Sequence, residues 1–149
     1  MKLSTKGRYG LKAMLDLAIH GQNGHIALNS IAERQHISEY YLEQLIAILR
    51  KAGLVESMRG AQGGYMLAKP PQEITVGDIL RTLEGSLAPV DCVMEDKKIE
   101  CLQADYCVTK SIWLKIRDSI NKVVDNITLQ DLVDDYKQAY AQATDMYYI

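Results

Sequence analysis

The stretch that decides the fold is HISEYYLEQLIAILRKAGL, residues 36–54. Its large aliphatic residues recur at the i, i+3, i+4, i+7 spacing that buries one face of an α-helix, namely at Leu42, Leu45, Ile46 and Leu49. Ser38 can cap the first-turn amides, and Gly53 can end the helix in the left-handed conformation. The stretch therefore predicts one strongly amphipathic helix.

Two further helices are expected before it. The first runs from about Ser4 to His20, with an apolar stripe at Leu11, Met14, Leu15, Ala18 and Ile19. GQNGH, residues 21–25, breaks it, and a short helix follows over residues 28–35 with Ile31 and Ala32 inward. Two short helices in close succession, the second strongly amphipathic, are typical of a helix-turn-helix.

A β-hairpin is expected directly after these helices. LVESMR (54–59) and YMLAK (65–69) have the composition of strands, and GAQGG (60–64) between them has that of a turn. Pro70 and Pro71 end the unit. The order of three helices and a hairpin predicts a mainly α fold with a small β-hairpin wing, a winged helix-turn-helix, over residues 1–70.

The remaining chain predicts two further parts. Residues 71–108 hold a linking helix, with Thr75 and Asp78 spaced as a capping box and Gly85 as its end, and then a cysteine-containing loop. Residues 109–149 hold a long helix to about Asn126 and a last helix from Thr128, with Leu132, Val133, Tyr136 and Tyr140 on one side of the latter. The long helix carries an apolar seam suited to pairing with a second copy of the chain, at Trp113, Ile116, Ile120, Val123 and Ile127.

The formal net charge of −2 divides unevenly along the chain. Residues 1–69 carry nine basic against five acidic residues, a net charge of +4, whereas residues 70–149 carry eight against fourteen, a net charge of −6. A basic half predicts a polyanionic partner for that half alone. The sequence offers neither a signal peptide nor an apolar run of about 20 residues, so we expect a cytoplasmic protein without a membrane partner.

Several residues of the first half suit contacts with double-stranded DNA. The amphipathic helix leaves Glu43 and Gln44 outward, where a glutamate can accept from cytosine and a glutamine can pair with adenine. Ser38 and the amides beside it can hold a phosphate. Arg59 and Gly60 lie at the flexible turn of the wing, suited to a minor groove. Residues at the start of the first helix are expected to contact phosphates, namely Lys2, Lys6, Arg8 and Tyr9.

Two other classes of function compete with DNA binding. One is a small thiol or metal redox protein, and the other is a winged helix that binds only protein. We expect no enzyme, because the sequence shows no nucleophile-and-base constellation, no phosphate loop and no three-histidine metal site.

Long motifs resemble a known family. MKLSTKGRYGLKAMLDLA (1–18), SIAERQHISEYYLEQLIAILRKAGLV (30–55) and RGAQGGYMLAK (59–69) closely resemble the bacterial winged-helix regulators that include IscR, NsrR and CymR, and SIWLKIRDSINKVVDNITLQDL (111–132) is similar to their dimerisation helix. The resemblance implies a homodimeric transcriptional regulator, most simply a repressor, on a nearly palindromic operator. By the family's pattern Ser38, Tyr41, Glu43 and Gln44 face bases, and Arg59 faces the minor groove.

Within the family, several segments most resemble the CymR group. They are SEYYLEQL (38–45), RGAQGGY (59–65), DILRTLEGSLAPV (78–90) and the ending MYYI. The resemblance implies control of cysteine and sulfur-uptake genes through a complex with cysteine synthase. Because that enzyme captures a C-terminal isoleucine from other proteins, Ile149 is a candidate docking group.

All three cysteines lie in CVMEDKKIECLQADYC, residues 92–107. Thiolates are soft ligands, so Cys92, Cys101 and Cys107 suit an iron–sulfur cluster or zinc, while a thiol redox switch or no function are the other interpretations. The resemblance to the IscR and NsrR groups implies an iron–sulfur cluster, of the 2Fe-2S type, and hence iron–sulfur homeostasis as an alternative regulon.

The cysteine pattern departs from the IscR group at two points. Its first gap is longer than usual, with eight residues between Cys92 and Cys101, and Lys110 stands where that group has a histidine. The fourth ligand therefore stays open among Asp91, Glu100, Asp105, a partner subunit and a small thiol.

Overall fold

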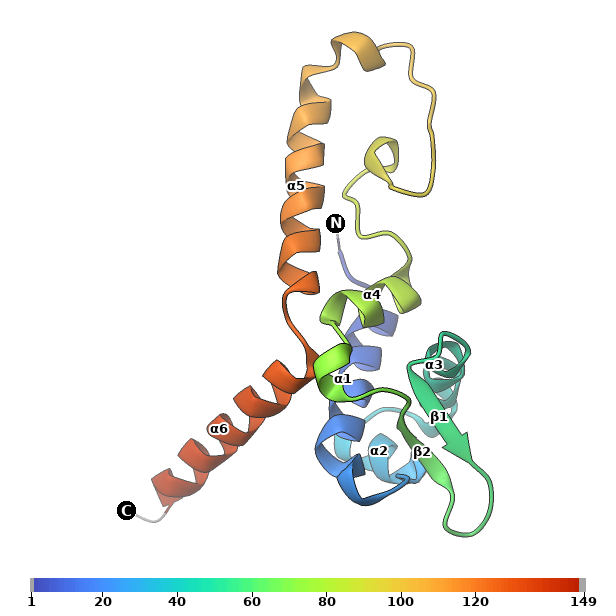
Figure 1. Ribbon diagram of the computed structural model, residues 1–149, viewed down its shortest axis with the longest axis vertical. Coiled ribbons are helices and arrows are strands. Elements are labelled where there is room, and N and C mark those ends of the chain that lie inside the picture. Colours follow the sequence, from blue (N-terminus) through green and yellow to red (C-terminus); the bar gives the residue numbers. More distant parts are fainter. Residues whose placement is uncertain (1, 148–149) are drawn as a thin grey trace.

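The computed structural model describes residues 2–147 of the chain. Six α-helices occupy most of them: α1 (Thr5–His20), α2 (Leu28–Gln35), α3 (Glu39–Lys51), α4 (Val76–Glu84), α5 (Val108–Asp125) and α6 (Leu129–Tyr147). A hairpin of β1 (Val55–Met58) and β2 (Gly64–Leu67) lies between α3 and α4. Figure 1 shows α1 to α4 and the hairpin gathered in one unit, from which α5 and α6 project in different directions. The mainly α architecture with a small hairpin is confirmed.

The helix-turn-helix is built as its sequence predicts. The Ser38 hydroxyl accepts from the Tyr41 amide at 3.2 Å and caps α3, and Gly53 follows the helix with φ 82°. All four residues of the predicted inner face are buried, namely Leu42, Leu45, Ile46 and Leu49. Burying each such side chain contributes roughly 1.5–3 kcal/mol, so this face fixes how α3 sits on the core.

Helix α1 buries a different face from the expected one. Met14 and Ala18 are buried as predicted, but Leu11, Leu15 and Ile19 are only half-buried. The buried face also includes Gly7, Gly10, Ala13 and Leu17. The cause is α4, which lies so close to α1 that a Cβ at Gly10 would meet the Leu83 side chain. Glycines carry no apolar signal, so the periodicity of large residues alone places the stripe wrongly.

The wing is an antiparallel hairpin with a third segment beside it. Val55 pairs with Leu67 and Met58 with Gly64. Ile26, in the connection before α2, exchanges two backbone hydrogen bonds of 2.8 Å with Tyr65 of β2. The bridge ties the hairpin to the helical unit, and the turn at residues 59–63 lies beyond that attachment.

The hydrophobic core continues past residue 70. Ile74, Ile79 and Leu83 around α4 belong to the same cluster as α1 to α3, and so do Leu129 and Val133 at the start of α6. Thr75 and Asp78 form the predicted capping box of α4, and Gly85 follows the helix. Residues on both sides of the projecting helix α5 are thus part of the core of the winged-helix unit.

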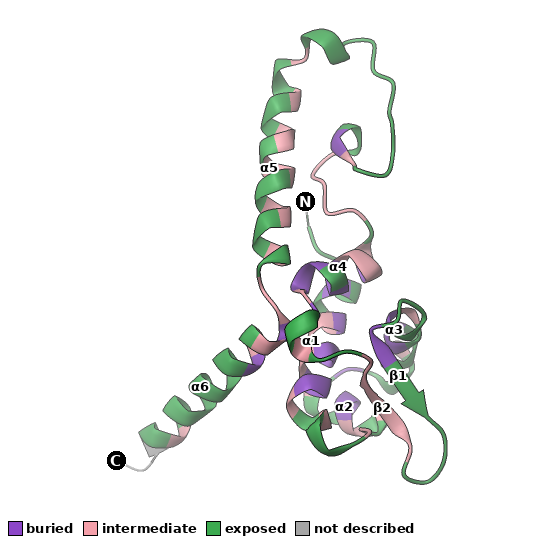
Figure 2. Ribbon diagram, viewed as in Figure 1, coloured by how far each residue is buried: buried purple, intermediate pink, exposed green. Residues whose placement is uncertain are grey.

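Helix α5 ends before the predicted seam does. It stops at Asp125, and Ile127 lies in the short connection where Val76 donates to its carbonyl at 2.8 Å. Ile127 thus lies just past the end of the helix, beside a backbone bridge between Thr75 and Thr128, and its part in a subunit contact stays a prediction. Figure 2 shows α5 as half-buried and exposed along its length, without a buried residue.

Helix α6 packs only at its beginning. Leu129 and Val133 are buried, whereas Tyr136 and Tyr140 are exposed and stack on each other with ring centroids 6.2 Å apart. Among the described residues, no helix combines the length and apolar character that crossing a bilayer requires. Ile149, the candidate docking residue, lies outside the described residues.

Candidate nucleic-acid interface and thiol loop

The N-terminal ends of α1 and α3 meet through a pair of side chains. Thr5, the first residue of α1, lies with its Oγ1 2.9 Å from the hydroxyl of Tyr41 in the first turn of α3. The Tyr41 ring meets Tyr9 of α1 edge to face, with ring centroids 6.2 Å apart. The start of α3 carries the partial positive charge of a helix N-terminus, which favours an anionic partner, whereas the start of α1 already holds the Glu84 carboxylate.

Basic side chains surround this junction. The Arg8 guanidinium carbon lies 5.9 Å and the Lys12 amine 5.6 Å from the centre of the Tyr9 ring. Lys2, Lys6 and Arg8 are exposed, and Tyr9 is half-buried. The predicted phosphate contacts are therefore all accessible or partly accessible, but Lys2 precedes α1 and lies near Leu80 and Glu84 of α4 rather than beside α3.

The predicted contacts on α3 differ in their surroundings. Ser38, the N-cap residue, and Glu43 and Gln44 on the helix are exposed. Tyr41 is half-buried, and its hydroxyl is engaged with Thr5. Glu43 and Gln44 are thus accessible to a partner, whereas the Ser38 hydroxyl caps α3 and Tyr41 joins the two helices.

The wing presents an exposed arginine at a strained turn. Arg59 and Gly60 are exposed. Gly60 has φ 111°, a backbone conformation that residues other than glycine rarely adopt. At the base of the wing, Arg50 of α3 donates to the Ser57 hydroxyl at 3.0 Å. This bond connects the last turn of α3 to β1, and it lies outside the set of residues that sequence reasoning identified.

An ion pair between the buried Asp16 carboxylate and the more exposed Arg34, which the sequence analysis missed, connects the helix-turn-helix to α1. Asp16 is 1% exposed and accepts from Arg34 at 2.7 and 2.9 Å and from Gln35 at 2.9 Å. The Asp16 hydrogen bond, foremost, raises the pKa of the Arg34 guanidinium above its ordinary value. The available signal was an acidic residue within the apolar stretch of α1.

Glu84, at the end of α4, holds the beginning of α1. Its Oε1 accepts from the Ser4 amide at 2.9 Å, the Ser4 hydroxyl at 2.5 Å and the Gly7 amide at 2.9 Å. Partial burial disfavours the carboxylate, but the hydrogen bonds from Ser4 and Gly7 outweigh it and lower the pKa of Glu84. The beginning of α1 is therefore fixed by the helix that leads into the cysteine segment.

The cysteines lie in the thiol loop, which we define as residues 86–107. Cys92 and Cys101 are exposed, and Cys107 is half-buried at the position just before α5. The Thr109 hydroxyl, 3.2 Å from the Cys107 sulfur, and the Lys110 and Thr109 amides lower the pKa of the Cys107 thiol. The Cys107 thiolate, the form in which sulfur binds metal, is thus easier to form than that of an unperturbed cysteine.

The three thiols suit an iron–sulfur cluster or zinc in kind but are not gathered in this conformation. Among the described residues, no group of three cysteine, histidine or acidic side chains lies close enough to hold one ion. Lys110 is half-buried near Cys107 and offers no imidazole. A site for a cluster would therefore require the loop to rearrange.

The apolar seam of α5 is incompletely covered by its own chain. Trp113, Ile116 and Ile120 are half-buried, and Val123 is 58% exposed. At about 100° per residue these four lie along one stripe, beside the face that carries Arg117 and Asn121 toward the thiol loop. The stripe is accessible to a partner along the length of the helix.

Comparison with known proteins decides the family. The model of the family Rrf2, described as "Iron-dependent Transcriptional regulator", matches residues 3–135. The chain belongs to the Rrf2 family. It is 46% identical over 152 residues to the HTH-type transcriptional regulator CymR of Bacillus subtilis, with all of both chains covered. The identification of the chain as a transcriptional regulator rather than an enzyme is confirmed.

Solved structures of Rrf2 relatives share the fold. CymR of B. subtilis, described as its global cysteine regulator, superposes with a TM-score of 0.74 at 48% identity, covering 90% of this chain and 97% of that one. IscR of T. potens gives a TM-score of 0.76 at 55% identity, covering 93% and 90%. The chain is thus similar both to CymR and to IscR. The winged-helix architecture is confirmed.

Proposed function

We propose that this Rrf2-family regulator acts in the cytoplasm as a homodimer, binds a nearly palindromic operator and represses the genes beside it. The observation that carries the proposal is the junction of α1 and α3. There the Thr5 Oγ1 lies 2.9 Å from the Tyr41 hydroxyl and joins the first turns of the two helices, and Lys6 and Arg8 of α1 are exposed. Such a surface suits a phosphate backbone next to an exposed helix end.

On DNA, the exposed end of α3 enters the major groove. Ser38, Glu43 and Gln44 then face base edges or the adjoining phosphate, and Arg59 with Gly60 reaches the minor groove. Lys2, Lys6, Arg8 and Tyr9 contact the backbone beside α3. Tyr41, which the family's pattern places toward bases, has a second role here because its contact with Thr5 sets the two helices relative to each other.

The dimer forms along α5. Its accessible stripe of Trp113, Ile116, Ile120 and Val123 would be covered by the same stripe of a second copy. A two-fold pair of reading helices requires two half-sites about one helical turn apart, roughly 34–36 Å. Helix α5 would carry the dimer contact and also contacts the thiol loop. A change in the loop could therefore alter the spacing between the two reading helices.

The signal enters at the thiol loop. Cys92, Cys101 and Cys107 would hold an iron–sulfur cluster, most simply of the 2Fe-2S type, when the loop gathers them, and zinc is the alternative. The likeness to CymR, described as a global cysteine regulator, supports a regulon of cysteine and sulfur metabolism, and iron–sulfur homeostasis is the alternative that the likeness to IscR supports. Docking of cysteine synthase on Ile149 belongs to the first of these and rests on the sequence alone.

Footprinting tests the operator proposal. Duplexes selected from a random library by the purified protein should show two protected half-sites about one turn apart, related by a two-fold axis. A single unsymmetrical footprint, or no selection at all, would contradict it. The cluster is tested by measuring the iron and sulfide content of protein purified without oxygen. Colourless, iron-free protein that still selects DNA would contradict a cluster-binding role of the three cysteines.

A further inference from the structure

Cys92 is anchored to the middle of α5 through the residue that follows it. It lies in the short turn Asp91–Val93, and Val93 is 2% exposed, the buried residue of that turn. Arg117 of α5 donates to the Val93 carbonyl at 3.1 Å. The backbone beside Cys92 is thus held both by burial of an apolar side chain and by a charged donor.

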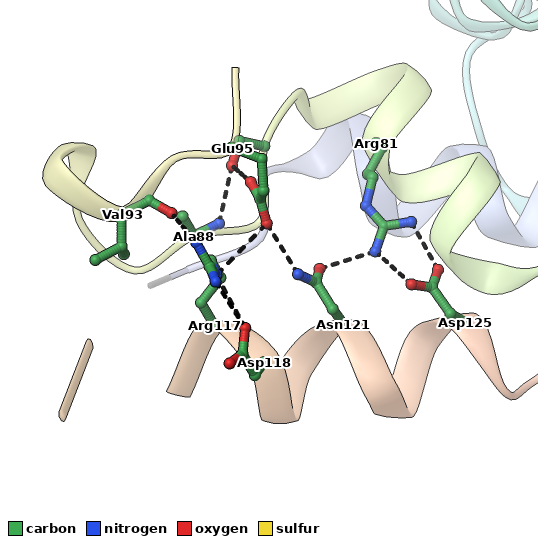
Figure 3. Close-up of polar contacts among 9 residues, drawn as sticks. Arg81, Ala88, Val93, Glu95, Arg117, Asp118, Asn121 and Asp125 are labelled. Atoms are coloured by element: carbon green, nitrogen blue, oxygen red, sulfur yellow. Dashed lines mark hydrogen bonds and ion pairs between the residues drawn. The ribbon is translucent and has the colours of Figure 1, made fainter. Parts of the chain in front are cut away.

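Glu95 adds a second attachment of the same turn. Its carboxylate accepts from the Asn121 amide at 2.9 Å and from the Ser86 hydroxyl at 3.0 Å, and it lies 3.8 Å from the Arg117 guanidinium. Figure 3 shows Glu95 between Arg117 and Asn121, and the contacts continue from Asn121 to Arg81 of α4. We call the contacts of Arg117 and Asn121 with Val93 and Glu95 the α5 latch.

Cys107 stands at the other end of the same helix. Ten residues separate it from Arg117, a rise of about 15 Å along α5, of which the arginine side chain spans only a part. Figure 1 shows the turn of residues 91–93 beside the middle of α5, with the exposed remainder of the loop arching back to the helix start. Two thiolates on one zinc ion, by contrast, lie at most about 4.6 Å apart.

We propose that Arg117 and Glu95 are positioning residues that hold Cys92 away from Cys107, so that the α5 latch and a gathered three-thiol site are alternative states of the loop. The inference deepens the proposed sensing function and rests on it. Cys101 is on an exposed stretch that can follow either state, whereas Cys92 must leave α5 for the thiols to meet. Binding of a soft metal or cluster would therefore release the α5 latch at the middle of the helix and form a new attachment at Cys107, at its start.

The latch is tested without metal by measuring how readily Cys92 and Cys107 meet. In a Cys101→Ser background, diamide oxidises these two thiols, and mass spectrometry follows the intrachain disulfide over time. Arg117→Met keeps the apolar stem but removes the donor, and it should speed disulfide formation about tenfold, because charge-assisted hydrogen bonds are among the stronger polar contacts. Lys115→Met is the matched control, since Lys115 is exposed on α5 outside the latch.

A second variant and a second readout guard against a folding defect. Glu95→Ala changes an exposed loop residue and should also speed the disulfide. In the three-thiol protein, Arg117→Met and Glu95→Ala should bind Co²⁺ more tightly by a similar factor, followed by thiolate-to-cobalt absorption. Rates and Co²⁺ affinities equal to those of Lys115→Met, weaker Co²⁺ binding, or acceleration only between subunits would each overturn the inference. Failure of the cluster proposal is seen separately, in the iron and sulfide content of the unaltered protein.

Discussion

Tyr41 connects the two helices that would touch DNA, and its hydroxyl contacts Thr5 at 2.9 Å. If this bond positions α3, then Tyr41→Phe and Thr5→Val should each weaken binding of a selected duplex by about fivefold, the equivalent of one neutral hydrogen bond. The double variant should be no weaker than either single one. A double-mutant cycle by fluorescence anisotropy measures this coupling.

The same cycle distinguishes a direct DNA contact of Tyr41. In that case Thr5→Val leaves affinity nearly unchanged and the two effects add. The salt dependence of affinity supplies a further control, because a positioning bond carries no phosphate contact and its loss should leave the salt slope as it was.

Arg59 is the exposed cation of the wing, beside the positive φ of Gly60. A guanidinium in a narrow, electronegative minor groove contributes to DNA affinity. Arg59→Ala should therefore lower the affinity for the selected duplex about tenfold or more. Lys69→Ala removes an exposed charge at the opposite end of the hairpin and is the matched control. Equal mobility-shift titrations for both variants at one salt concentration would contradict a role of the wing.

Glu84 makes stability depend on acid. Its pKa is lowered in the folded chain, because the bonds from Ser4 and Gly7 outweigh partial burial, so it stabilises the fold above its unfolded pKa of about 4.3. This contribution is lost as the pH falls through the lowered value. The melting temperature of Glu84→Gln should therefore be reduced at pH 7 and fall less steeply below about pH 5 than that of the unaltered protein. Parallel pH profiles would exclude this role.

Among the elements, α5 carries the expected dimer contact. A carboxylate in the middle of its stripe would be buried against the second copy, so Ile116→Glu should convert the dimer to monomers in sedimentation experiments at micromolar concentration. Lys122→Glu places a carboxylate on the opposite side of the same helix as a control. Dimers that persist in Ile116→Glu would place the subunit contact elsewhere.

The elements differ in how far their sequence predicts them. Helix α3 follows from its pattern because one buried face and two caps all specify the same segment. The stripe of α1 was placed wrongly because its closest neighbour, Leu83, packs on Gly10, which has no side chain to show the contact. Ile127 keeps the heptad spacing but lies beside the bridge between Thr75 and Thr128, which depends on a segment far away in the sequence.

The thiol loop marks the limit of sequence reasoning at the candidate site. The residue types and the exposed face of α3 were predictable, because composition and periodicity determine them. The positions of the thiols were not, because they depend on tertiary contacts of Val93, Arg117 and Glu95 that no periodicity reports.

At the scale of the whole molecule, one hydrophobic core connects helices α1 to α3 with α4 and α6, the helices before and after α5. Leu129 of α6 and Ile79 of α4 lie in the cluster that also holds Leu45 of α3. Glu84 binds the start of α1, and Arg81 on the same helix pairs with Asp125 at 2.6 Å. A displacement of α5 therefore has a short physical path through α4 to the helix end that would meet phosphates.

Sequence-specific binding of DNA by this surface is tested most directly by anisotropy titrations of one selected duplex and one scrambled duplex between 50 and 200 mM salt. The selected duplex should bind about 10³-fold more tightly or better, and both affinities should fall steeply as salt rises, because lysine and arginine contacts release counterions from the phosphates. Equal affinity for the two duplexes, or affinities that do not respond to salt, would contradict a sequence-specific DNA-binding function.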